Sequence, residues 1–234
     1  MPTWLAIAKG PLFYFALAIL ILGLARLIVL ALWGIAGAIR RAGDRRIPYT
    51  RVLKETVAWL VPLRRLHRVQ PVYSYASFFL HLGVILSGLA LQNHIDILSA
   101  NTGLAWPGLP RLWLDGITLA AMFATVYLLL HRVYIHRARV LSRPMDYLLL
   151  LLILNLLVSG YVAGRSWNPV PYDGLMLFHV ANGLLLFVLT PFTKIAHCVL
   201  FPLVRLASEV AWYFPRHGGS DVIKTLYGTE GRKI

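Results

Sequence analysis

Four of the eight histidines stand in or beside two long apolar stretches, residues 72–92 and 175–201, and they are the residues of this chain best suited to chemistry. His81 lies within SFFLHLGVIL and His179 within LMLFHVANG, while His94 follows the first stretch and His197 ends the second. An ionisable side chain in an apolar membrane segment is costly and is a functional candidate by default. Two imidazoles from facing helices can fill both axial positions of a haem iron. The four histidines therefore predict bis-histidine haem.

A purely structural role is the alternative, in which each histidine only bonds a neighbouring carbonyl in a helix bundle. The pairing of His81 with His179, without a nearby acidic residue to suggest a proton relay, favours haem. Zinc is disfavoured because no carboxylate or cysteine lies at short helical spacing as a further ligand. The single cysteine, Cys198, cannot form an internal disulfide, a thiolate-held iron–sulfur cluster or a c-type haem attachment. We interpret it as a free thiol near the membrane interface.

The spacing of the histidines predicts how they lie on their helices. His179 and His197 are 18 residues apart, which is five helical turns or about 27 Å on one face. Pro191 lies between them and predicts a kink that changes this distance. His81 and His94 are 13 residues apart, so a straight helix would rotate them about 140° from each other. That rotation argues against a shared face for the second pair.

The elements that must position these residues are membrane-spanning helices. Hydrophobic residues make up 59% of the 234 residues and charged residues only 14%, too few for a water-soluble domain. Stretches of about 18 apolar residues or more can cross a membrane as helices. Five occur, at residues 11–39, 72–92, 114–130, 147–162 and 175–201. The sequence thus predicts an all-α, five-helix transmembrane domain over residues 1–202 and a cytoplasmic tail over 203–234.

The charge pattern predicts the topology. The formal net charge is +14, and most cations lie at residues 40–68 and 132–143, after the first and third stretches. The loops after the second and fourth stretches hold only Arg111 and Arg165 as cations. The positive-inside rule then places the N-terminus outside and the C-terminus in the cytoplasm, so the charge does not indicate a nucleic-acid partner. Residues 52–63 predict a short helix on the inner membrane face, with a loop as the alternative.

The motifs around the histidines resemble a known family. FHVANGLLLFVLTPFTKIAH is similar to the gamma subunit of respiratory nitrate reductase, where a histidine, a Pro-Phe-Ser/Thr-basic turn and a second histidine mark one helix. SFFLHLGVIL and RVLSRPMDYLLLLL extend the resemblance over most of the chain. In that family the second haem ligand of this span lies ten residues after the first. The first corresponds to His81 here, and the position ten residues later is occupied by Leu91. QNHIDIL with AWPGLP is more similar to cytochrome b subunits of sulfur-metabolism complexes associated with dissimilatory sulfite reductase.

The resemblance implies a dihaem cytochrome b of a respiratory complex in the cytoplasmic (inner) membrane. It implies that His94 and His179 bind the iron of an outer haem b. His81 and His197 would bind that of an inner one, and His67 stays open as an alternative to His94. It also implies electron exchange between membrane quinone or quinol and an iron–sulfur subunit at the cytoplasmic face, similar to heterodisulfide reductase. The lysine that serves quinol in the nitrate enzymes has no clear counterpart here. The resemblance therefore does not indicate where the quinone site of this chain lies.

Two basic residues are candidate contacts for haem propionates. Arg26 interrupts the first apolar stretch and Lys194 precedes His197, with snorkelling and interface anchoring as their alternatives. The chain has no Gly-rich nucleotide loop, cysteine cluster or catalytic triad, so we expect an electron-transfer subunit without its own substrate-reducing site. We expect the tail to contact the iron–sulfur subunit. The alternative function is a non-redox membrane anchor or a transporter-like subunit whose histidines are structural.

Overall fold

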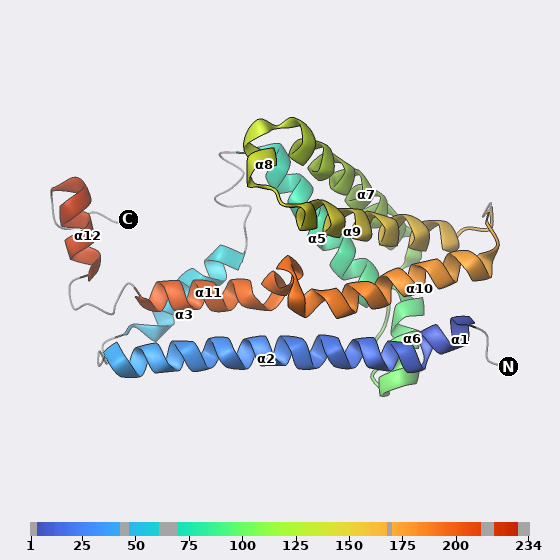
Figure 1. The fold of residues 1–234 in the computed structure, drawn as a ribbon, viewed down its shortest axis with the longest axis horizontal. Helices are drawn as coiled ribbons and strands as arrows, with labels where there is room; N and C mark the ends of the chain where they lie inside the picture. Colours follow the sequence, from blue (N-terminus) through green and yellow to red (C-terminus); the bar gives the residue numbers. More distant parts are fainter. Residues whose placement is uncertain (1–3, 43–46, 61–69, 168–169, 212–217, 229–234) are drawn as a thin grey trace. The chain divides into compact units, whose positions relative to one another are not determined.

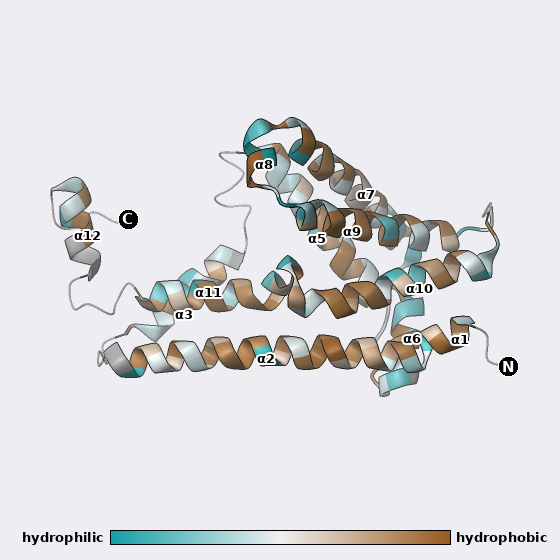
Figure 2. Ribbon diagram, in the orientation of Figure 1, coloured by the Kyte–Doolittle hydropathy of each residue, from teal (hydrophilic) through white to brown (hydrophobic). Residues whose placement is uncertain are grey.

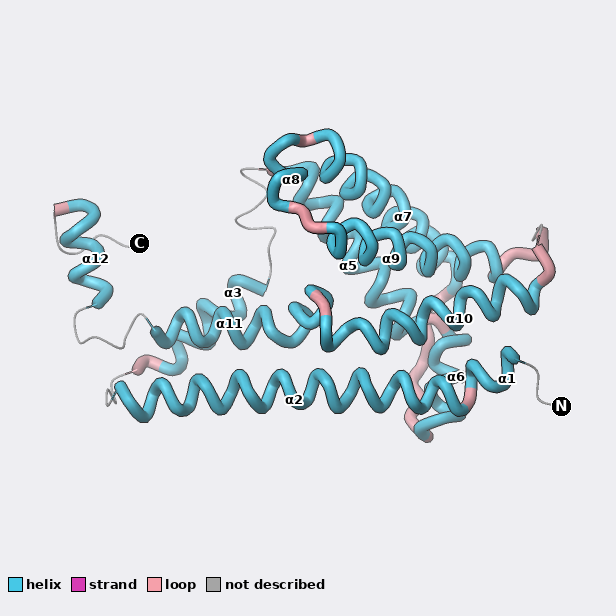
Figure 3. The backbone as a smooth tube through the Cα atoms, in the orientation of Figure 1, coloured by secondary structure: helices cyan, strands magenta, loops and turns pink. Residues whose placement is uncertain are grey.

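Helices are the regular elements of this protein in the residues that the computed structural model describes, which are 4–42, 47–60, 70–167, 170–211 and 218–228. Short loops join most of them (Figure 3). With the labels of Figure 1, they are α1 (Trp4–Lys9), α2 (Pro11–Ala42), α3 (Tyr49–Leu60), α5 (Pro71–Ala90), α6 (Gln92–Thr102), α7 (Arg111–Tyr134), α8 (His136–Leu141), α9 (Pro144–Ala163), α10 (Tyr172–Leu189), the 3₁₀ turns η1 (Thr190–Phe192) and η2 (Lys194–Ala196), α11 (His197–Ala211) and α12 (Gly218–Tyr227).

Five helical segments of the described chain are long and apolar enough to cross a membrane, which confirms the predicted all-α multi-pass class. They are Trp4–Arg40, Pro71–Ala90, Arg111–Tyr134, Pro144–Ala163 and Tyr172–Phe192. In each, at most 33% of the most apolar window is buried inside the protein. Hydrophobic residues run along α2, α9 and α10 in Figure 2. Most of this apolar surface is therefore available to lipid. The direction of insertion stays a prediction.

The chain divides into two compact units. Unit 1 comprises Met1–Leu20 and Pro62–Leu189, and unit 2 comprises Ile21–Val61 and Thr190–Ile234. The predicted boundary at residue 202 falls inside α11, which contains Pro202 and continues to Ala211. The separation of a membrane domain from a cytoplasmic tail at that position stays a prediction.

The core of unit 1 lies where α5, α7 and α9 pack together. Its buried side chains are Leu80, Ala121, Ala124, Leu128, Leu150 and Leu157. Gly83 of α5 faces Ala121 of α7 so closely that a Cβ at Gly83 would collide with the Ala121 methyl group. Small residues at a contact let two helix backbones approach, which is how helices associate without a hydrophobic driving force in lipid.

The core of unit 2 lies between α3 and α11, where Ile47, Val52 and Val210 are buried. The Arg205 guanidinium lies 3.8 Å from the centre of the Trp59 ring, a cation–π contact between the two helices. Arg205 also forms an ion pair of 2.9 Å with Glu209. The helix predicted at residues 52–63 is therefore present as α3 up to Leu60, and its last three residues lie outside the described chain.

The second predicted stretch, residues 72–92, is present as α5, but this helix does not continue to His94. α5 ends at Ala90, Leu91 is extended with ψ 123°, and α6 begins at Gln92. The loop before α7 satisfies the carbonyls that this break frees. Trp106 Nε1 donates to Leu89 O at 2.7 Å, and Leu109 N donates to Ala90 O at 2.9 Å. Because His94 lies on α6, the rotation of 140° expected for a straight helix does not apply, and that expectation was wrong.

The fifth predicted stretch is also interrupted, as Pro191 predicted. α10 ends at Leu189, the turns η1 and η2 follow, and α11 begins at His197. Proline lacks the N–H that would continue the helix. Within unit 2, a Cβ at Gly23 of α2 would lie 2.5 Å from Pro191 Cβ, so a glycine is needed where α2 passes this turn. The straight-helix distance of 27 Å therefore does not describe this segment.

Candidate functional site

The structure brings His94 and His179 together inside unit 1. Their ring centroids are 6.0 Å apart, and the ring planes differ by 9°. An imidazole nitrogen binds a metal at about 2 Å, so two rings on opposite sides of one ion have centroids about 6 Å apart. This is the pair that the family resemblance assigned to one haem. The centroid distance matches that of two axial ligands of one iron.

Hydrogen bonding fixes the tautomer of His94. Its Nδ1 lies 2.7 Å from Ser87 O. A carbonyl oxygen can only accept, so Nδ1 carries the proton and Nε2 carries the lone pair that can bind a metal. Burial lowers the pKa of the His94 imidazole, and the bond to Ser87 opposes this shift only in part. The neutral ring, which is the metal-binding form, is therefore favoured.

Two residues of α9 position the His179 ring. Ser159 Oγ lies 2.6 Å from Asn155 O and 3.0 Å from His179 Nδ1. The single hydroxyl proton goes to the carbonyl, so Ser159 accepts from His179 Nδ1, and Nε2 of His179 carries the lone pair. The neighbouring Gly160 leaves room for the ring, because a Cβ there would lie 2.7 Å from His179 Cε1. Neither residue was predicted from the sequence, where the only signal was a Ser-Gly pair in an apolar span.

The two rings line a cavity of about 740 Å³ within unit 1. This volume lies in the usual range for small-molecule and cofactor sites, about 300–1,000 Å³. Lys9 and Arg111 are the basic residues that line it. Arg111 donates to Gly164 O, and Asp115 pairs with Arg165 at 2.9 Å and with Arg111 at 3.8 Å. The cavity thus combines apolar walls, two imidazoles and two basic side chains that could pair with the carboxylates of a ligand.

The other two predicted ligands have the same tautomer. His81 Nδ1 lies 2.7 Å from Ser77 O, and His197 Nδ1 lies 2.7 Å from Lys194 O. Both acceptors are carbonyls, so Nε2 again carries the lone pair. His81 belongs to unit 1, whereas His197 belongs to unit 2. His67 lies outside the described residues.

The candidate propionate contacts from the sequence, Arg26 and Lys194, both belong to unit 2. Both side chains are exposed there. By its place in the sequence Arg111 is only a loop cation, whereas in the structure it lies in the wall of the histidine cavity. Its position depends on how the loop after α6 folds back, which spacing along the chain does not reveal.

His94 and His179 are the two imidazoles that line this cavity. Among the described residues, no group of three or more histidine, cysteine, aspartate or glutamate side chains could hold an ion. Two imidazoles alone leave a metal under-coordinated. A porphyrin brings four equatorial nitrogens and needs only two axial ligands from the protein. The His94–His179 pair and its cavity therefore fit a haem.

Comparison with known proteins adds one relative. A curated protein of Nitratidesulfovibrio vulgaris (strain Hildenborough) is 28% identical over 204 residues, which cover 86% of this chain and 89% of that protein. Its name states no activity. No protein-family model matches the chain, and no solved structure matches it.

Proposed function

We propose that this protein is a membrane dihaem cytochrome b subunit that exchanges electrons between the quinone pool and an iron–sulfur partner. The observation that carries the proposal is the His94–His179 pair, two nearly parallel imidazoles 6.0 Å apart in a cavity of unit 1. Haem, when bound, supplies one-electron oxidation and reduction at iron. The protein contributes axial ligands, their orientation and an apolar surrounding.

His94 and His179 are the axial ligands of the outer haem b in this proposal. Ser87 O and Ser159 Oγ hold the two rings through Nδ1 and keep Nε2 available for the iron. Lys9 and Arg111 are suited to pair with the propionates. His81 and His197 are the proposed ligands of the inner haem, and their bonds to backbone carbonyls give the same support. Arg26 and Lys194 stay candidate contacts for the propionates.

The remaining parts of the proposal rest on the sequence. The basic residues at 40–68 and 132–143 support an inner-membrane protein with a cytoplasmic C-terminus. The iron–sulfur subunit would then dock at the cytoplasmic face, on the side of α3, α11 and the tail. Quinol oxidation releases two electrons and two protons, and quinone reduction consumes them. The residues described allow either direction.

Haem content in alanine variants tests the proposal. We expect the purified protein to show a b-type α band after dithionite reduction, with two haems per chain by pyridine haemochromogen assay. His94→Ala and His179→Ala should each leave one haem and give the same residual spectrum. His81→Ala and His197→Ala should each leave the other haem.

The matched control is His136→Ala, because His136 is exposed at the start of α8. It should keep both haems. A protein without visible absorption would refute the cytochrome and favour a membrane anchor or a transporter-like subunit. Loss of one haem in His67→Ala but not in His94→Ala would overturn the assignment of His94 as a ligand.

A further inference from the structure

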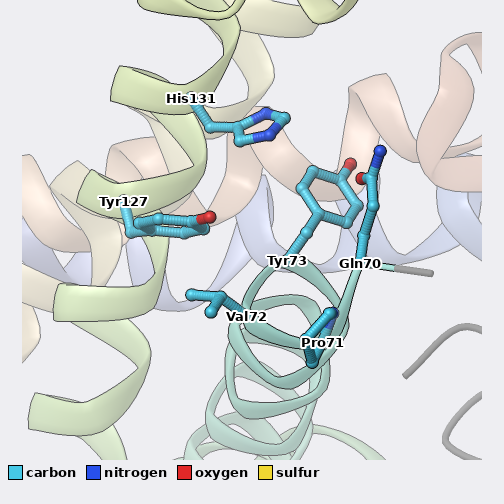
Figure 4. A pocket seen from close by; sticks show the side chains of 6 residues that line it. All are labelled: Gln70, Pro71, Val72, Tyr73, Tyr127 and His131. Atoms are coloured by element: carbon cyan, nitrogen blue, oxygen red, sulfur yellow. The ribbon is translucent and has the colours of Figure 1, made fainter. Parts of the chain in front are cut away.

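A second, smaller cavity of unit 1 lies between the start of α5 and the end of α7. Its volume is about 290 Å³, and it is lined by Gln70, Pro71, Val72, Tyr73, Tyr127 and His131. Figure 4 shows the His131 ring between the rings of Tyr127 and Tyr73, with Gln70 beside Tyr73. The His131 centroid lies 5.0 Å from that of Tyr73 and 5.9 Å from that of Tyr127. The cavity is thus bounded by three flat rings.

His131 differs from the four candidate haem ligands in its hydrogen bonding. Its Nδ1 is buried and has no hydrogen-bond partner within the described part of the chain. A buried polar group without a partner costs free energy, about as much as a lost hydrogen bond. The same nitrogen in His81, His94, His179 and His197 bonds an oxygen. The His131 imidazole therefore lines the cavity with hydrogen-bonding capacity that the described part of the chain does not use.

The lining defines the chemistry of that ligand. Tyrosine and histidine rings favour a flat, conjugated ring system. The imidazole nitrogen, the two phenol groups and the Gln70 amide can bond carbonyl or hydroxyl oxygens at the edge of such a ring. Val72 leaves 61% of its surface exposed, so the wall that it forms is open on one side. A volume near 290 Å³ holds a single ring system, and a long apolar tail would stay in the lipid.

We propose that this cavity binds the headgroup of a membrane quinone or quinol, with the His131 imidazole hydrogen-bonded to a ring oxygen. The assignment rests on the proposed function, to which it adds the location of the quinone site. Tyr73 precedes His81 by eight residues on α5, about 12 Å along the helix axis. The headgroup would therefore bind on the same helix as a proposed ligand of the inner haem.

Titration of the full-length protein in detergent with decylubiquinone tests the site. His131→Phe keeps a ring of similar size and removes both nitrogens, and Tyr73→Phe removes one hydroxyl group. We expect His131→Phe to weaken quinone binding about tenfold, the effect of one hydrogen bond. Its melting temperature should not fall, because Nδ1 has no protein partner to lose. The control, His136→Phe, changes an exposed histidine five residues away and should leave the affinity unchanged.

The haem content of the same samples separates this inference from the proposed function. Two haems with equal quinone affinity in wild type, His131→Phe and Tyr73→Phe would refute the site and leave the cytochrome standing. Loss of co-purified phospholipid in His131→Phe, without a change in quinone affinity, would assign the cavity to lipid and also refute it. A wild type without haem would refute the cytochrome, while weaker binding in His131→Phe would still support the cavity as a quinone site.

Discussion

Gly160→Ala should disturb the outer haem site, because Gly160 of α9 faces the proposed ligand His179 of α10. A Cβ at this position would lie 2.7 Å from Cε1 and 3.3 Å from Nδ1 of His179. Carbon atoms pack at about 3.5–4.0 Å, so the ring must retreat by about 1 Å. A functional site tolerates a displacement of only about 0.5 Å. Loss of correct ligand orientation typically lowers metal affinity about 10–100-fold. We therefore expect Gly160→Ala to retain one haem of two.

The assay is the haem-to-protein ratio by pyridine haemochromogen, together with the redox midpoint potentials of the remaining haem. Gly116→Ala is the matched control, because Gly116 lies in α7 and a Cβ there would meet no atom within 4 Å. It should keep both haems, and it should stabilise the helix, since alanine has the higher helix propensity. Two haems with unchanged potentials in Gly160→Ala would show that His179 is not held against α9 as described, and the reasoning would fail.

Two further substitutions test the packing and the second ligand sphere. Ser159→Ala removes the acceptor for His179 Nδ1, so haem affinity at the outer site should fall about 10–100-fold while the inner haem stays. Titration of the haem-free protein with haem measures this affinity. An affinity equal to that of the wild type would contradict the role of Ser159. Gly83→Val forces a side chain against Ala121 where α5 meets α7, and should cost about 1–3 kcal/mol of stability. Its melting temperature should fall well below that of Gly34→Val, where a Cβ meets nothing within 4 Å, and similar values would exclude the close contact.

Hydropathy alone was enough to predict the five long apolar helices. A helix that crosses lipid must be apolar over about 20 residues, so each span stands out without knowledge of its neighbours. The interruption at Pro191 was also predictable, because proline acts locally on its own helix. The same holds for α3, whose alternation of apolar and charged residues marks a helix with one buried face.

The break at Leu91 followed by a second helix could not be predicted, because no proline or glycine stands directly beside Leu91. It depends on the distant loop before α7, which donates to the carbonyls of Leu89 and Ala90. The roles of Ser159 and Gly160 were hidden for the same reason. Neither residue type suggests haem, and their importance appears only when α9 and α10 pack together. The histidines could be found in the sequence, but the residues that orient them are defined by tertiary contacts.

The break between α5 and α6 has a consequence for comparing this chain with others. On one continuous helix, adding three residues between two ligands would rotate one of them by about 300° relative to the other. Here Leu91 separates the helices, so the number of residues from His81 to His94 can change at the joint while each ring keeps its own helical setting. A search pattern with a fixed gap between the two histidines would miss such chains. One with a variable gap, followed by a tryptophan-containing return loop like AWPGLP, would find them.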